Sequence, residues 1–270
     1  MVIIDVRRFD ALIFDLDGVI TQTASIHARA WKRLFDDLLS RQAAQTGAAF
    51  VPFDLENDYR RYVDGKPRIA GVTSFLAARR IMLPIGAPED QADRETIYGL
   101  ASRKDHYFTE LVRQEGVRVS ASASSLLREA RIRGMRTAVA SSSHHCAELL
   151  DTAGLTSLFD TRVDGIDLDQ LGLPGKPAPD MFLEAARRLN AVPQRTAVFE
   201  DAVVGIQAAR AGDFGLVIGV GSTARVPGLL EHGADAVVAD LGEIHLEKYP
   251  DHPWGGLVIG VGPSKRDASD

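Results

Sequence analysis

Cysteine and long apolar runs are both scarce in this chain of 270 residues. The single cysteine, Cys146, excludes an internal disulfide framework and is typical of a reducing compartment. No apolar run approaches the length that crosses a membrane, and the N-terminus lacks the long apolar stretch of a signal peptide. We therefore expect a soluble, cytoplasmic protein with no membrane partner.

Basic residues are fewer than acidic ones in this chain. The chain has 31 Lys and Arg against 37 Asp and Glu, a net charge of -6. This balance argues against a dedicated nucleic-acid-binding protein. A composition that is 45% hydrophobic and 25% charged excludes a disordered chain. The length allows one large domain or two smaller ones.

Short apolar runs alternate with helical stretches in the second half of the chain. The runs, bounded by polar residues or glycine, are residues 137–140, 196–199, 216–218 and 236–238. Helical stretches are predicted at residues 122–133, 179–189 and 202–211. Gly134 and Gly212 stand just past two of these helices, where a left-handed cap favours glycine. The alternation predicts an α/β fold, a doubly wound parallel sheet covered by helices on both faces.

The span from the first strand to about Val119 is helical instead. Residues 25–41 have apolar side chains at helical spacing, and further helices are predicted at residues 71–81 and 90–115. We therefore expect a discontinuous Rossmann-like core and an inserted helical cap that could act as a lid. The expected boundaries are residues 1–21 and 120–245 for the core, 22–119 for the cap, and 246–270 for a C-terminal tail of uncertain order.

The most informative segment is the apolar run of residues 11–14 with the acidic turn that follows it. The run predicts a buried strand, and Asp15 and Asp17 stand at its end, next to Gly18. Carboxylates beside a hydrophobic core are costly unless a cation offsets their charge. One interpretation is a shared polar pocket that binds a cation, and the other is a solvated Asp-Leu-Asp turn.

Three other polar segments matter because of where the predicted sheet would put them, and the acids and serines among them fall on the same edge as Asp15. Ser141 to Ser143 follow one strand, Glu200 and Asp201 follow another, and Lys176 lies in a loop before a helix. Ligands of doubly wound sheets bind outside the carboxyl ends of the strands. A carboxylate nucleophile, oxygen ligands for Mg²⁺, hydroxyl donors and a lysine are the groups that phosphoryl transfer requires. Taken singly, the serines and Asp201 are also good helix caps, and Lys176 is a common solvated turn residue.

Together these segments resemble the haloacid-dehalogenase superfamily. Its four motifs match Asp15-Leu-Asp17-Gly-Val, Ser141, Lys176 and Glu200-Asp201 in the expected order. Within the superfamily the chain is most similar to the β-phosphoglucomutase group. The segments that carry this closer similarity are residues 15–23, 27–31, 65–68, 103–104, 176–180 and 199–206. The resemblance covers roughly residues 10–241.

The resemblance implies a role for each matched residue. Asp15 would be the nucleophile that becomes an aspartyl phosphate, and Asp17 the general acid and base. Mg²⁺ would be the cofactor, held by the Asp15 side chain, the Asp17 carbonyl, Asp201 and Glu200. The residues expected to contact phosphate or substrate are Ser141, Ser142, Lys176, Arg68, Thr23, His27, Lys104 and Gly65. For the cap residues among them, an ordinary helix position or a solvated charge is the alternative.

The chain departs from the group at His144 and His145, where a mutase often has Lys-Asn. These histidines and Cys146 are consecutive, and consecutive helix positions point about 100° apart, so they cannot easily share one metal ion. We interpret them as the surface of a helix.

The activity implied by the resemblance is interconversion of β-D-glucose 1-phosphate and glucose 6-phosphate through a bound glucose 1,6-bisphosphate. A Mg²⁺-dependent sugar-phosphate phosphatase stays open, because it needs the same motif residues. A third hypothesis is a phosphosugar-binding module of a longer polypeptide, motivated by an identical heptapeptide at residues 215–221 and 256–262. The expected partner is a small phosphorylated sugar, and the expected state is a monomer or weak homo-oligomer.

Overall fold

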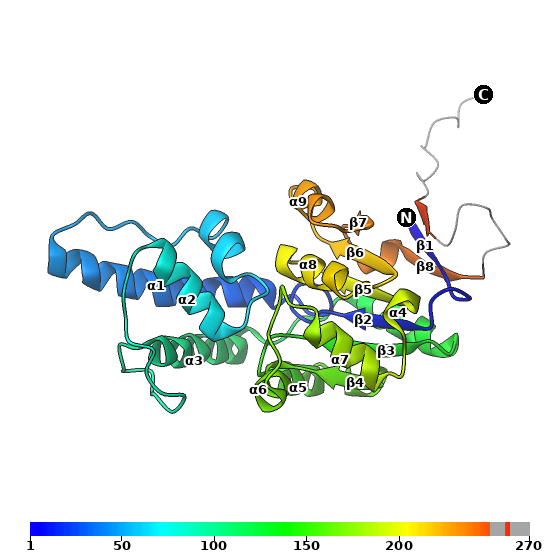
Figure 1. The fold of residues 1–270 in the computed structure, drawn as a ribbon, viewed down its shortest axis with the longest axis horizontal. Coiled ribbons are helices and arrows are strands. Elements are labelled where there is room, and N and C mark those ends of the chain that lie inside the picture. Colours follow the sequence, from blue (N-terminus) through cyan, green and yellow to red (C-terminus); the bar gives the residue numbers. More distant parts are fainter. Residues whose placement is uncertain (249–256, 260–270) are drawn as a thin grey trace, which may run out of the picture.

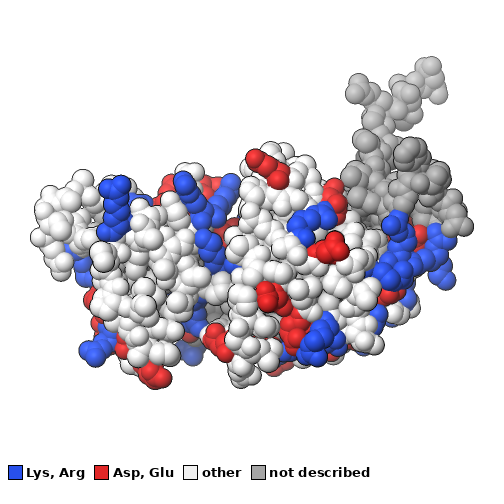
Figure 2. Space-filling view, viewed as in Figure 1, with Lys and Arg blue, Asp and Glu red and all other residues white. Residues whose placement is uncertain are grey.

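The computed structural model describes residues 1–248 and 257–259. A sheet with flanking helices forms one end of an elongated molecule, and a group of long helices forms the other (Figure 1). On the face shown in Figure 2, Lys and Arg side chains are interspersed with Asp and Glu. Within the described ranges, no helix is both long and apolar enough to cross a membrane.

The main sheet has the strand order β4-β3-β2-β5-β6-β7, and each neighbouring pair is parallel. Its strands are Ala11–Phe14 (β2), Arg136–Ala140 (β3), Thr161–Val163 (β4), Thr196–Glu200 (β5), Leu216–Val220 (β6) and Ala236–Val238 (β7). The predicted doubly wound parallel sheet is confirmed. The sequence pattern did not predict β4, because this strand has only three residues and a single buried side chain.

Helices cover both faces of this sheet. They are Ala121–Ile132 (α4), Cys146–Thr152 (α5), Gly165–Leu171 (α6), Asp180–Arg188 (α7), Val203–Ala211 (α8) and Val226–Glu231 (α9). Leu12 and Phe14 of β2 belong to the apolar cluster that includes α4 and α5, whereas Ile13 belongs to the one with α7 and α8. Successive side chains of a strand point to opposite faces, so β2 is buried on both sides. This burial is the reason for its unbroken apolar run.

A second, three-stranded sheet joins the two ends of the described chain. It consists of Val2–Asp5 (β1), Ile244–Glu247 (β8) and Leu257–Ile259 (β9), in the order β8-β1-β9. The first two residues of the expected tail, Leu246 and Glu247, continue β8, which pairs in parallel with β1. The first copy of the repeated heptapeptide forms β6. Of the second copy only β9 is described, and the remainder of the tail lies outside the described residues.

The long helices between β2 and α4 are Ala24–Thr46 (α1), Arg68–Ala78 (α2) and Ile97–Glu115 (α3), with a π-helical turn at Tyr59–Val63. They enclose an apolar cluster of their own, which includes Trp31, Phe35 and Phe75. The helix predicted from residue 90 begins only at α3, because the Thr96 side chain caps it by accepting a hydrogen bond from the Gly99 N–H at 3.0 Å. The proposed division into core and cap stays a prediction.

The two ends of this helical segment leave the sheet side by side. The backbone N–H of Gln22 donates to the Arg118 carbonyl at 2.8 Å, and that of Ser120 donates to the Ile20 carbonyl at 3.0 Å. The helices are therefore attached to the sheet through two paired strands of chain beside the acidic turn.

One predicted glycine cap is confirmed and the other is wrong. Gly134 has the expected left-handed backbone, with φ of 73°. Gly212 has φ of -85°, and Asp213 adopts the left-handed conformation instead. A Cβ at Gly212 would lie 2.7 Å from the Phe214 ring, so close packing favours glycine there.

Candidate active site

Three carboxylates meet at the C-terminal edge of the main sheet. Asp15 follows β2, Glu200 ends β5, and Asp201 comes next in the chain. β2 and β5 are hydrogen-bonded neighbours, with Phe14 opposite Phe199, so their ends bring these acids together. One oxygen of each carboxylate lies within 4.8 Å of the other two, and all three side chains are buried.

Lys176 is the positive group inside this cluster. Its Nζ donates to Asp15 Oδ1 at 2.6 Å and to Glu200 Oε1 at 3.1 Å, and the side chain is fully buried. Although burial alone would lower it, the two carboxylates raise the pKa of Lys176 above its usual value. The solvated-turn interpretation of Lys176 is therefore wrong.

The three acids have more negative charge than Lys176 offsets. Burial, and then the Glu200 charge, raise the pKa of Asp15 well above its usual value. Burial likewise raises the pKa of Asp201, and the neighbouring Asp64 adds to the effect. Buried carboxylates with raised pKa values are stabilised by a cation. Converging carboxylate oxygens are the ligands that Mg²⁺ prefers, so this donor set fits the predicted cofactor.

The backbone at Gly18 passes directly beside the acidic cluster. Its φ is 96°, and a Cβ there would lie 2.3 Å from Asp201 Oδ2. Glycine is required at this position by both the backbone conformation and the close approach.

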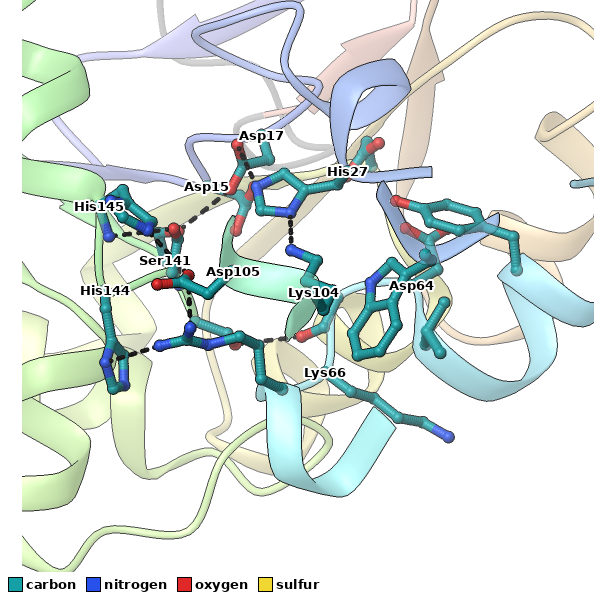
Figure 3. Close-up of a pocket in the computed structure, with 18 of the residues that line it drawn as sticks. Asp15, Asp17, His27, Asp64, Lys66, Lys104, Asp105, Ser141, His144 and His145 are labelled. Atoms are coloured by element: carbon teal, nitrogen blue, oxygen red, sulfur yellow. Dashed lines mark hydrogen bonds and ion pairs between the residues drawn. The ribbon is translucent and has the colours of Figure 1, made fainter. Parts of the chain in front are cut away.

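The Asp17 side chain lies between His27 of the helical part and Ser141 of the sheet end (Figure 3). Its Oδ1 accepts a short hydrogen bond from Thr23 Oγ1 and lies 3.3 Å from His27 Nε2. Its Oδ2 accepts a hydrogen bond from Ser141 Oγ at 3.3 Å. Burial opposes ionisation, but His27 and the Thr23 hydroxyl hold the pKa of Asp17 at about 2.

His27 connects Asp17 to Lys104 of α3. Lys104 Nζ lies 2.7 Å from His27 Nδ1, and the lysine side chain is buried beside the rings of Trp31 and Phe108. Burial, and then the charge of Arg68, lower the pKa of Lys104 to about 7. A His27 tautomer with its proton on Nε2 satisfies both contacts, because Nδ1 can then accept from Lys104. The alternative of a solvated Lys104 is wrong.

His144 and His145 line the pocket, so their interpretation as helix surface is wrong. They precede α5, which begins at Cys146, and they face the helical part of the molecule (Figure 3). His145 Nε2 lies 2.9 Å from Asp105 Oδ1, and His144 Nδ1 lies 3.0 Å from Arg68 Nη2. Arg68 also forms an ion pair with Asp105. The sequence pattern could not predict the partners of these two histidines, because Arg68 and Asp105 lie on helices that are distant in the chain.

The segment before α2 packs directly against the sheet end. Ser142 Oγ donates to the Gly65 carbonyl at 3.1 Å. Gly65 has φ of 70°, and a Cβ there would lie 2.7 Å from a methyl group of Val204. The close packing of this segment against the sheet end therefore requires glycine at position 65. Gly65 was among the residues expected to contact substrate, and it lines the pocket.

A pocket with about 630 Å³ of empty space, its open mouth included, lies between the two parts of the molecule. All of the predicted site residues line the pocket or contact residues that line it. The lining residues that sequence reasoning missed are Trp31, Tyr59, Val63, Asp64, Lys66, Asp105 and Ser143. Trp31, Lys66 and Ser143 lie in segments that the sequence analysis singled out without giving these residues a site role, whereas the other four belong to no recognised motif and only the fold reveals them.

Known proteins resemble this chain in sequence and in structure. A family model described as haloacid dehalogenase-like hydrolase matches residues 9–213. A curated β-phosphoglucomutase of Mycobacterium bovis is 46% identical over 241 residues, which cover 88% of this chain and 92% of that protein. A phosphorylated carbohydrates phosphatase of Thermotoga maritima is 28% identical, over 85% of this chain and 94% of that protein. The crystal structure of a β-phosphoglucomutase from Clostridium difficile superposes with a TM-score of 0.66 and 25% identity, covering 87% of this chain and 92% of that chain.

The matched range includes the four motifs and the helical segment inserted between the first two. The strand order, the acidic cluster and these similarities lead to one conclusion. The chain belongs to the haloacid dehalogenase-like hydrolase family, in its β-phosphoglucomutase-like group.

Proposed function

We propose that this protein is a β-phosphoglucomutase, which interconverts β-D-glucose 1-phosphate and glucose 6-phosphate through an aspartyl phosphate and a bound glucose 1,6-bisphosphate. The observation that carries the proposal is a pocket with cationic groups at two ends. Lys176 is buried behind the lining residue Asp15 at one end, and Arg68 and His145, both paired with Asp105, lie at the other. A bisphosphate requires two such ends, and the mycobacterial relative supports the assignment.

Both parts of the chain contribute to the pocket: Lys176 and Asp15 belong to the sheet part, whereas Arg68 belongs to the helical segment, and His145 of the sheet part contacts Asp105 of that segment. We propose that residues 1–21 and 120–245 form the catalytic core and that residues 22–119 form a cap over it. A mutase must keep its aspartyl phosphate from water until a sugar hydroxyl arrives, and a closed cap excludes water.

Asp15, Glu200 and Asp201 would hold the Mg²⁺ ion, with the Asp17 carbonyl as a further ligand. When bound, Mg²⁺ offsets the negative charge that spreads over the transferring phosphoryl group. Lys176, which contacts Asp15, would face the same group from the protein side, and Ser141 and Ser142, which now donate to Asp17 and to the Gly65 carbonyl, would donate hydrogen bonds to its oxygens.

Asp15 and Asp17 divide the work of each transfer. An Asp15 oxygen bonds to phosphorus while the bond from phosphorus to the sugar oxygen breaks, and Asp17 gives that oxygen a proton. In the other direction the ionised Asp17 takes a proton from the sugar hydroxyl that attacks the aspartyl phosphate. With its pKa of about 2, Asp17 starts ionised and acts first as the base, so the proton that it later gives to a sugar oxygen is the one that it took from the attacking hydroxyl.

Thr23, His27 and Lys104 would link Asp17 to the cap. Thr23 and His27 contact the Asp17 carboxylate, and the other ring nitrogen of His27 contacts Lys104 of α3. Closure of the cap would then align Asp17 with the sugar oxygen, while Arg68 contacts the distal phosphate.

A sugar-phosphate phosphatase is the second candidate, supported by the similarity to the Thermotoga maritima phosphatase. It would use the same Asp15 step and then transfer the phosphoryl group to water. The motif residues serve both reactions equally.

The deciding experiment follows β-D-glucose 1-phosphate by ³¹P NMR, with Mg²⁺ and a trace of glucose 1,6-bisphosphate. A mutase gives glucose 6-phosphate with little inorganic phosphate. Release of inorganic phosphate without glucose 6-phosphate would overturn the mutase and favour the phosphatase. Absence of both products would contradict a catalytic role toward this sugar and favour the binding module.

The remaining expectations also stay proposals. We expect a small phosphorylated sugar as the partner, a cytoplasmic location, and a monomer or weak homo-oligomer.

A further inference from the structure

Asp64 is a buried carboxylate that neither the motifs nor the proposed mechanism uses. It follows the π-helical turn in the proposed cap, and only 6% of the residue is exposed. Its Oδ2 accepts a hydrogen bond from Arg225 Nη2 at 2.6 Å. Arg225 lies just before α9, at the C-terminal edge of the main sheet.

The same guanidinium reaches the acidic cluster. Arg225 Nη1 donates to Asp201 Oδ2 at 2.9 Å. One planar group therefore joins a cap carboxylate to a carboxylate of the proposed cation site. Because Arg225 contacts Asp201 through only one oxygen, it leaves the other oxygen open while it fixes the orientation of that side chain.

Asp64 reaches this position only because its segment is seated on the core. The next residue, Gly65, accepts a hydrogen bond from Ser142 and packs against Val204 and Ala202. Movement of the cap away from the sheet would break these contacts and withdraw Asp64 from Arg225.

The formal charges at the sheet end favour such a link. Asp15, Glu200 and Asp201 face Lys176 and Arg225, which leaves one excess negative charge when the acids are ionised. Seating Asp64 beside Arg225 raises the excess to two, which is the charge that one divalent cation carries. Asp17 is outside this balance, because His27 and Lys104 lie beside it.

We propose that Asp64 couples cap closure to divalent cation binding through Arg225. This inference rests on the proposed function only in that Asp15, Glu200 and Asp201 form the cation site. The closed cap adds a negative charge near the cation, so the closed form binds the cation more tightly. By reciprocity the bound cation favours the closed cap by the same factor.

The test uses Mn²⁺ as the probe and no substrate. Free Mn²⁺ is measured by EPR to give a dissociation constant, and small-angle X-ray scattering with and without Mn²⁺ gives the change in radius of gyration. The key variant is Asp64→Asn, which removes the charge and keeps the shape. The matched control is Asp58→Asn, the same change in a cap carboxylate whose ion pair with Arg79 lies within the helical part.

For the wild type and Asp58→Asn we expect the same Mn²⁺ affinity and the same compaction on Mn²⁺ binding. For Asp64→Asn we expect Mn²⁺ to bind at least about 5-fold more weakly, the lower end of usual coupling between sites, and to cause less compaction. Asp64→Glu keeps the charge, so its Mn²⁺ dissociation constant should be within about 2-fold of the wild-type value. That result would show that the weaker Mn²⁺ binding of Asp64→Asn comes from the lost charge and not from misfolding.

Equal Mn²⁺ affinity in Asp64→Asn and Asp58→Asn would overturn the coupling and leave the cation site standing. A wild type that binds no Mn²⁺ would instead overturn the cation site, and the coupling with it. Neither result depends on whether the enzyme is a mutase or a phosphatase, which the product experiment decides separately.

Discussion

The sheet end and the helical side of the pocket are built in different ways. At the sheet end, Asp15 and Glu200 are fixed by adjacent strands, and Lys176 is fully buried between them. On the helical side, Arg68 and Asp105 are partly exposed and paired with each other, and each also contacts a histidine of the sheet part, His144 and His145 respectively. The first arrangement cannot move without breaking the sheet, whereas the second can exchange partners.

This difference separates reaction chemistry from substrate recognition. Groups that form and break bonds gain from a rigid frame, because small displacements are costly to catalysis. Groups that recognise the distal phosphate must release their present partners when the substrate arrives. Substitutions on the two sides should therefore affect different quantities.

The largest expected effect is that of Asp15→Asn at the sheet end. An amide cannot form the aspartyl phosphate, so turnover should fall by at least about 10⁴-fold. Steady-state kinetics with β-D-glucose 1-phosphate measure the loss, and circular dichroism shows whether the fold is kept. If Asp15→Asn keeps turnover within about tenfold of the wild type, another group must act as the nucleophile, and the role of Asp15 is disproved.

Lys176→Met should cause the largest loss of stability. It leaves Asp15 and Glu200 buried without their lysine, and breaking a buried pair costs about 3–5 kcal/mol. Urea unfolding without divalent cations measures the change in the free energy of unfolding. Lys32→Met, which removes a half-exposed pair with Asp36, is the matched control and should cost no more than about 1 kcal/mol. Equal losses in the two variants would contradict the contrast.

Arg68→Ala tests the recognition side. Loss of a charged hydrogen-bonding group should raise KM by about 10- to 100-fold and change kcat much less, since the group lies away from Asp15. Arg61→Ala, on the same part of the chain but outside the pocket lining, should keep the wild-type KM. A fall in kcat with an unchanged KM would place Arg68 in the chemical step instead.

The smallest effect should be a pH dependence of stability from His145. Hydrogen bonding to Asp105 raises the pKa of His145 in the folded protein. The contact therefore contributes fully below the usual pKa of 6.5, and its contribution is lost as the pH rises through the folded value. Because both groups are partly exposed, the contribution should be under about 1 kcal/mol. Thermal unfolding of the wild type and His145→Gln from pH 5 to 9 measures it, and parallel pH profiles would argue against the contact.

The sheet end was largely predictable from sequence, for a physical reason. Strand ends are local features of the sequence. An apolar run that stops at Asp15 or Glu200 predicts both the strand and the polar residue at its end. Parallel pairing then brings every such edge together, which places Ser141 without any knowledge of side-chain contacts. Lys176 lies in the loop between α6 and α7 and follows no strand, so its place came from the family resemblance. The short strand β4 and the edge strand β8 carried too little apolar pattern to be found.

The helical side was predictable only in part. Arg68 and Lys104 came from the family resemblance, and the structure places both in the pocket. The bridging roles of His145 and Arg225 were missed, because their partners are set by the way distant helices and loops pack. Helical periodicity predicts which side chains a helix buries, and it does not predict what they meet.

The central place of β2 has a consequence for how the protein is made. Asp15 emerges early in synthesis, yet its neighbour β5 lies more than half the chain later. Until the ribosome has released that later strand, one side of β2 has no partner, and the acids that share a cation are not yet together. Pairing between such remote segments is slow, so assembly of the catalytic centre should be among the last events of folding.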